Sequence, residues 1–319
     1  MTSARITDLG RGVYQVTHPL PWALDHVHCY AVAGPDGWTL IDSGLAGGDA
    51  GARWREALDA LGSPRVRTIV LTHYHPDHIA GSAALARLTQ AEEVLQGAYD
   101  SVLARRVFCD PGNAERLAAY LGEQGMPPEL VFASVADESS YFAPPAEPTR
   151  LLEAGDTVEL GGEEFAVLAL PGHADGHIGL YSERTGRLFG GDVLLTGITP
   201  NVGRWQHTLP DPLGRYLVTL DRLAELRPSV VYPGHNRVLE DGAGRAREIQ
   251  GHHAARLDVH YEALRGGAAT PYEVAASVWG TGLGLHERRF ALVEAISHLV
   301  RLERLGLAVE VATARWQAA

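Results

Sequence analysis

The sequence predicts an α/β fold in which the ends of several strands carry a metal site along one edge of a sheet. Short apolar runs such as residues 66–71 are typical of buried strands. Each of four such runs is followed within three residues by a histidine or an aspartate. Amphipathic stretches such as residues 215–226 are typical of helices. With 319 residues, the chain is long enough for one large domain and a small one.

Seven candidate ligands follow these apolar runs. They are His73, His75, Asp77 and His78 after residues 66–71, His173 after residues 165–170, Asp192 after residues 187–191, and His235 after residues 229–232. Imidazole and carboxylate ligands without thiolate favour Zn²⁺ foremost, with Mn²⁺ or Fe²⁺ as alternatives. A closed structural zinc site uses four ligands, so seven predict two divalent metal ions with open positions for water. Such an arrangement is catalytic.

These motifs resemble those of the metallo-β-lactamase superfamily. The matching pieces, in family order, are Leu40-Ile41-Asp42-Ser43-Gly44, Thr72-His73-Tyr74-His75-Pro76-Asp77-His78, Pro171-Gly172-His173, Gly190-Gly191-Asp192 and Pro233-Gly234-His235. The resemblance covers about residues 6 to 240. It implies an αβ/βα four-layer sandwich, in which two sheets are faced by helices and the metals lie in a cleft along one sheet edge.

The resemblance also implies a role for each ligand. His73, His75 and His173 would hold the first metal; Asp77, His78 and His235 would hold the second; Asp192 would bridge both. Asp77 would in addition hold or shuttle a proton, so that Asp77 and Asp192 are the candidate catalytic residues. Asp42 is expected to orient a ligand or its loop, although an Asp before Ser-Gly is equally typical of a turn. His177 is expected to form structural hydrogen bonds rather than to bind a metal.

Subfamily differences narrow the expected reaction. Zinc β-lactamases of this fold commonly have Cys or Ser at the bridging position, so Asp192 argues against antibiotic hydrolysis. The motifs resemble more closely those of the other hydrolases of the superfamily, which are glyoxalase II, lactonases, thioesterases and ribonucleases. The leading hypothesis is a hydrolase that cleaves a small ester or thioester with a hydroxide bridging two metals. The alternatives are a phosphodiesterase or endoribonuclease, an iron-dependent sulfur dioxygenase, and a non-catalytic scaffold.

Two segments are candidates for substrate contacts. An insert at about residues 92–148, with a helix expected at 114–124, is longer than a strand connection requires. It either covers the metal cleft or lies at the periphery of the fold. The loop 196–213 starts close to a ligand, and loops beside a rigid scaffold often determine specificity. The candidate substrate-binding residues are Tyr74, Tyr141, Asn201, Trp205 and His207, of which Trp205 is equally typical of a core anchor.

The last segment, residues 244–319, is expected to form a separate module after a catalytic domain at 1–243. Helices are predicted at 244–264, after the cap Thr270, and at 288–305, with a strand at 306–311. This order resembles the winged helix that some β-lactamase-like endoribonucleases carry. The segment from 245 contains nine Arg and eight acidic residues, a net charge of +1, and the rest of the chain carries −13. Without a basic surface, packing or homodimerisation is favoured over nucleic-acid binding.

Composition limits the compartment and the chemistry. Two cysteines cannot build a disulfide framework, the first residues show no signal-peptide core, and no apolar stretch approaches the roughly 18 residues that a membrane helix needs. We therefore expect a cytoplasmic protein that acts on a small molecule and does not contact membranes. The sequence contains no lysine, which excludes Schiff-base chemistry and a Gly-Lys phosphate-binding loop.

Overall fold

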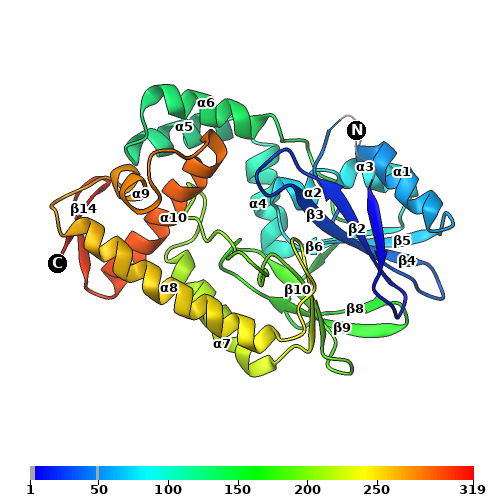
Figure 1. The fold of residues 1–319 in the computed structure, drawn as a ribbon. Helices are drawn as coiled ribbons and strands as arrows, with labels where there is room; N and C mark the ends of the chain where they lie inside the picture. The colour runs from blue at the N-terminus through cyan, green and yellow to red at the C-terminus, as the bar shows by residue number, and fades with distance from the viewer. Residues whose placement is uncertain (1–3, 48–49) are drawn as a thin grey trace.

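The computed structural model describes residues 4–47 and 50–319. Two β-sheets stack face to face, and helices cover the outer face of each (Figure 1). The strands of the first sheet, in spatial order, are β1 (Arg5–Asp8), β2 (Val13–Pro19), β3 (His26–Val32), β4 (Trp38–Ile41), β5 (Val66–Leu71), β6 (Glu93–Gly97) and β7 (Arg150–Leu152). Those of the second sheet are β12 (Val230–Pro233), β11 (Arg187–Gly191), β10 (Ile178–Tyr181), β9 (Glu163–Ala169) and β8 (Thr157–Leu160). The predicted αβ/βα sandwich is confirmed.

Strand periodicity explains why the central strands of the first sheet are apolar on both faces. Successive side chains point to opposite faces of a sheet. In β5, Ile69 and Leu71 pack under the helices of the outer layer, whereas Val70 packs between the two sheets. In β6 likewise, Val94 belongs to the outer core and Leu95 to the core between the sheets. A strand buried on both faces therefore appears as the continuous apolar run that predicted it.

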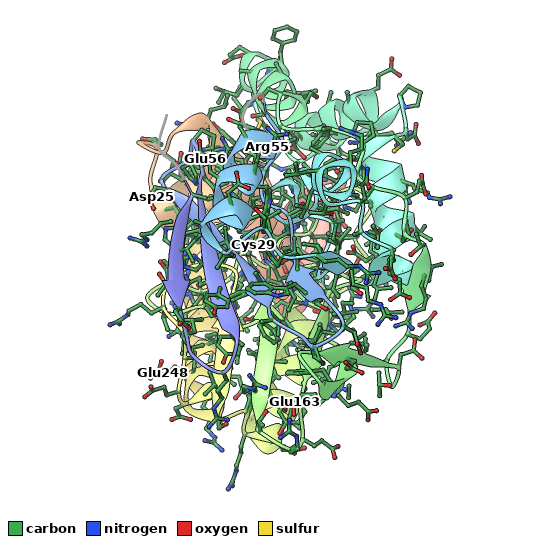
Figure 2. The ribbon with its side chains drawn as sticks, turned by 90° about the vertical axis from the view of Figure 1, so that its right-hand side faces the viewer. Asp25, Cys29, Arg55, Glu56, Glu163 and Glu248 are labelled. Carbon is green, nitrogen blue, oxygen red and sulfur yellow. The ribbon has the colours of Figure 1, made fainter. Side chains whose placement is uncertain are left out.

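Helices complete the sandwich on both sides. The outer face of the first sheet is covered by α1 (Ala50–Ala60), α3 (Ser82–Thr89) and α4 (Ala98–Phe108), and that of the second by α7 (Pro212–Leu226) and α8 (Gly242–Leu264) (Figure 1). In α1, Trp54 is buried against the sheet, whereas Arg55 and Glu56 are exposed (Figure 2). The same view shows Cys29 inside the molecule, on β3. The amphipathic pattern therefore fixes which helix face meets the sheet.

The insert predicted at residues 92–148 needs a correction. Its first residues form β6, which pairs in parallel with β5 and with β7 and belongs to the sheet. The helices that follow are α4, α5 (Asn113–Glu123) and α6 (Pro128–Ser139). A five-residue strand between longer segments gives little periodic signal, because only Val94 and Leu95 are large and apolar.

The end of the chain forms three helices and a hairpin: α8, α9 (Pro271–Trp279), α10 (Leu285–Arg304), β13 (Ala308–Ala312) and β14 (Arg315–Ala318). Thr270 caps α9, as the sequence predicted, and Glu273 completes a capping box. The predicted boundary before residue 244 falls in the first turn of α8, and the winged-helix likeness stays a prediction. Leu117 and Leu121 of α5 share a core with these helices, so the insert and the tail pack together (Figure 1). None of the helices in the described ranges is long and apolar enough to cross a membrane.

Candidate metal centre

The seven candidate ligands all lie where strands end. His73, His75, Asp77 and His78 follow β5, with the last two in the short helix α2 (Pro76–Ile79). His173 follows β9, Asp192 follows β11 and His235 follows β12. The fold brings them together in three overlapping groups able to hold metal, which are His73–His75–His173, His73–His78–Asp192 and Asp77–His78–His235.

Asp192 lies at the centre of these groups. Its Oδ2 is 3.2 Å from His235 Nε2 and 3.6 Å from His173 Nε2, and its Oδ1 is 3.4 Å from His78 Nε2. One carboxylate thus faces histidines that the resemblance assigns to two different ions. This is the position that a bridging ligand requires.

Hydrogen bonds fix the orientation of four of the imidazole rings through their Nδ1 atoms. The partners are Thr72 Oγ1 for His73 at 3.0 Å, Asp42 Oδ2 for His78 at 2.8 Å, the Asn201 carbonyl for His173 at 2.7 Å and the His26 carbonyl for His235 at 2.6 Å. Partners of this kind select the tautomer of a metal-binding histidine and raise its basicity. Each ring is left with Nε2 as the atom directed at its neighbours in the group.

Unsatisfied atoms at the centre of the groups fit a cation. Nε2 of His73, His78 and His173 and Oδ1 of Asp192 are buried and have no hydrogen-bond partner. Buried polar atoms almost always have partners, because leaving one unpaired costs about 1–3 kcal/mol. Four such atoms converging from three segments, which follow β5, β9 and β11, match the donor set of a divalent metal site.

Burial and charge together act on the protonation of these ligands. Burial lowers the pKa of His73 and of His173, which favours the neutral imidazole that binds metal. Burial acts in the same direction on His235, but Asp192 and Asp77 outweigh it and raise the pKa of His235 to about 10. The carboxylates therefore attract positive charge to this point, and a metal ion would replace the proton there.

Two glycines allow the ligands to approach one another. A Cβ on Gly234 would lie 2.3 Å from Asp192 Oδ1 and 2.5 Å from His78 Cε1. Gly191 has a φ of +48°, and a Cβ there would lie 2.8 Å from both His177 Nε2 and Thr72 Oγ1. A side chain at Gly234 would thus displace a candidate ligand, and one at Gly191 would displace residues that hydrogen-bond to His73 and Asp192.

The two residues expected to support the ligands lie beside them. Asp42 is buried, and its carboxylate accepts hydrogen bonds from the backbone and side chain of Thr72 as well as from His78. His177 is buried and accepts a hydrogen bond from the Asp192 backbone N–H through Nε2 at 3.1 Å, and it belongs to none of the three groups. The geometry supports the predicted role of each.

A cavity of about 550 Å³ opens beside the centre and is lined by His75, Asp77, His173, Asp192 and His235. All five predicted substrate-binding residues also line it: Tyr74, Tyr141, Asn201, Trp205 and His207. Tyr74 and His207 contact each other, with 2.8 Å between the Tyr74 hydroxyl and His207 Nε2. The Asn201 amide is already hydrogen-bonded to Glu294, so this side chain positions the wall.

Several lining residues were not predicted, because they come from distant segments. Trp22 precedes β3, Trp279 ends α9, and Arg289, Phe290 and Glu294 belong to α10. One signal for α10 is present in the sequence. Glu294 follows Phe290 by four residues, so it lies on the same face of the predicted helix as the apolar positions 290, 293 and 296. A glutamate on an apolar helix face is informative, because Glu is almost never fully buried unless it is paired.

Comparison with known proteins now decides the family. The model of the metallo-beta-lactamase superfamily matches residues 22–235, which include all seven candidate ligands. The chain belongs to the metallo-beta-lactamase superfamily. The probable metallo-hydrolase YqjP of Bacillus subtilis is 31% identical over 232 residues, covering 70% of this chain and 71% of that protein.

Other superfamily members are similar over more of the chain. An acyl-coenzyme A thioesterase of Gallus gallus is 27% identical over 263 residues, covering 79% of this chain and 86% of that protein. The crystal structure of a metallo-beta-lactamase family protein from Thermus thermophilus has a TM-score of 0.87 at 33% identity, and covers 98% of this chain and 100% of that chain. That match extends over the C-terminal helices. The predicted enzyme class, a metal-dependent hydrolase of the superfamily, is confirmed.

Proposed function

We propose that the protein hydrolyses a small ester or thioester at a dinuclear metal centre. The observation that carries the proposal is that an apolar cavity opens directly onto the metal-binding groups, so that one bound molecule can contact both. The thioesterase named among the relatives supports the acyl substrate. In this proposal His73, His75 and His173 would hold one ion, Asp77, His78 and His235 would hold the other, and Asp192 would contribute a ligand to both. Zn²⁺ is the ion we expect, since the ligand set contains imidazole and carboxylate without thiolate.

The residues of the chain have distinct tasks in this reaction. Two divalent ions bound here would polarise the carbonyl and lower the pKa of water to near neutrality. Asp77, whose Oδ2 is 3.3 Å from His235 Nε2, would accept the proton of the attacking water and deliver it to the leaving group. Asp42 would keep the His78 ring in the tautomer that presents Nε2. Tyr74 and His207 would contact the substrate from the cavity wall.

A side-by-side assay tests this function. The zinc-loaded protein is given an acyl-coenzyme A thioester and an activated phosphodiester, and kcat/KM is compared. We expect a clear preference for the thioester, which Asp192→Ala abolishes with the fold retained. Asp258→Ala, which removes an exposed carboxylate from α8, serves as the matched control and should behave as wild type. A preference for the phosphodiester, or full activity of Asp192→Ala, would contradict the proposal.

A further inference from the structure

The cavity wall formed by α6 and α10 contains one arginine, and its charge is already neutralised. Arg289 is the only arginine that lines the cavity among the described residues, and its side chain is 2% exposed. Its Nη1 donates to the Ser134 carbonyl at 2.8 Å and to Asp137 Oδ2 at 3.2 Å, and its Nε lies 3.1 Å from Glu138 Oε2. Two carboxylates therefore surround this guanidinium, and its positive charge is not available to a substrate.

Further carboxylates line the same wall without a cationic partner. Glu294 and Glu287 both line the cavity, and neither forms an ion pair with any described residue. Burial raises the pKa of Glu294 to about 7, because the loss of water around the carboxyl group outweighs the attraction of Arg256 and the hydrogen bond from Asn201. A second carboxylate brought into this space would meet the same desolvation and repulsion from the first.

The cavity surface next to this wall is apolar and aromatic. Trp22 stacks on His286 with ring centroids 4.9 Å apart and meets Tyr141 edge to face at 5.0 Å. Phe142, Leu283 and Phe290 also line the cavity. Surfaces of this kind bind hydrocarbon favourably, because they remove its methylene groups from water. The wall is thus suited to a hydrocarbon chain.

From these contacts we infer that the substrate carries an uncharged, apolar acyl group, and that the α6–α10 wall rejects acyl groups ending in a carboxylate. The inference rests on the proposed function, because it names the acyl group of that same reaction. Glu138 and Asp137 act as specificity determinants in it by neutralising Arg289, and Glu287 and Glu294 act by direct repulsion. Glutathione-type carboxylates or coenzyme A phosphates would have to lie outside this part of the cavity.

Two thioesters with the same neutral leaving group test the inference. The phenyl thioester of octanoic acid is compared with that of its ω-carboxylated counterpart, suberic acid, on the zinc-loaded protein at pH 8. We expect kcat/KM to be about 30-fold or more higher for the octanoyl substrate, since the wall leaves a buried carboxylate unpaired. The ratio of kcat/KM values is unaffected by non-productive binding of the carboxylate at the metals. A ratio near one would overturn the inference.

Isosteric variants assign the selectivity to the wall. Glu138→Gln removes one of the two carboxylates that neutralise Arg289. It should lower the ratio of kcat/KM for the octanoyl substrate to kcat/KM for the suberyl substrate by about tenfold. Glu287→Gln should also lower this ratio. Glu129→Gln makes the same change on the exposed face of α6 and should leave the ratio unchanged. If both cavity variants keep the wild-type ratio, the wall does not set the specificity.

A binding measurement separates failure of this inference from failure of the proposed function. Trp22, Trp205 and Trp279 line the cavity, so their fluorescence reports on its occupant. Octanamide should produce a saturable change in the wild type that Leu283→Asp weakens. Binding without hydrolysis of either thioester would overturn the proposed function and leave the cavity assignment standing. Hydrolysis without octanamide binding would overturn the inference alone.

Discussion

The carboxylate of Asp42 accepts a hydrogen bond from Nδ1 of His78 at 2.8 Å and so directs Nε2 of that ring toward Asp192. The same carboxylate accepts the backbone N–H of Thr72 at 2.8 Å. Asp42 follows β4 and Thr72 follows β5, so one side chain joins two strand ends and orients a candidate ligand. A turn-forming role alone would not require these contacts.

Asp42→Asn is therefore expected to weaken metal binding. The amide has only one oxygen that accepts, so it cannot accept both from the Thr72 backbone N–H, which contacts Oδ1, and from His78, which contacts Oδ2. Loss of such a supporting contact typically costs about 10–100-fold in metal affinity. Zinc affinity, measured by competition with a chelating indicator, checks this. Asp36→Asn, at an exposed turn, is the control, and equal affinities of the two variants would contradict the role of Asp42.

Gly234→Ala is expected to disrupt the centre. The new Cβ would lie 2.3 Å from Asp192 Oδ1 and 2.5 Å from His78 Cε1, so at least one of these side chains must move. Displacement of a ligand by about 1 Å is enough to impair a metal site. Metal content after dialysis should fall to one ion per chain or less. Retention of the full wild-type content would show that the loop adjusts without cost.

Gly251→Ala provides the comparison for this change. Gly251 lies inside α8, and a Cβ there would meet nothing within 4 Å. Alanine is favoured over glycine in a helix interior by roughly 0.5–1 kcal/mol, so this variant should unfold at slightly higher denaturant concentration with unchanged metal content. A loss of metal in both variants would mean that the effect at Gly234 is not local.

Glu294 is expected to make folding stability fall as the pH rises. Burial raises its pKa from 4.5 to about 7, so between these values the folded protein keeps a proton that the unfolded chain has released. Stability then decreases through this window, by about 3 kcal/mol at most. Glu294→Gln should remove that decrease and gain stability over wild type between pH 5 and pH 8. The urea midpoints of the metal-free proteins, measured across this pH range, report the stability difference, with Glu129→Gln as control. Parallel pH profiles for wild type and Glu294→Gln would contradict the assignment.

The positions of the candidate ligands could be predicted from the sequence, because the signals for them are local. An apolar run marks a strand, and the residue after it lies at the sheet edge, so His173, Asp192 and His235 could be placed without any contact map. The cap of α9 was predictable for the same reason, since Thr270 and Glu273 are three residues apart.

The cavity wall could not be predicted, because it depends on contacts between distant segments. Arg289 appeared in the sequence only as half of an Arg-Arg pair flanked by glutamates, which is typical of an exposed helix face. In the fold it is buried against Ser134 and Asp137, more than 150 residues away. The strand β6 was assigned to the insert for a related reason: its place in the sheet comes from pairing with β5 and β7.

Metal content measures the central claim most directly, and the decisive comparison is between wild type and Asp192→Ala. Protein purified in the presence of zinc and passed over a desalting column is analysed for metal by mass spectrometry. The geometry of Asp192 between His78, His173 and His235 predicts two divalent ions per wild-type chain and at least one fewer in the variant. Two ions in both proteins, or fewer than two in the wild type, would contradict the dinuclear centre.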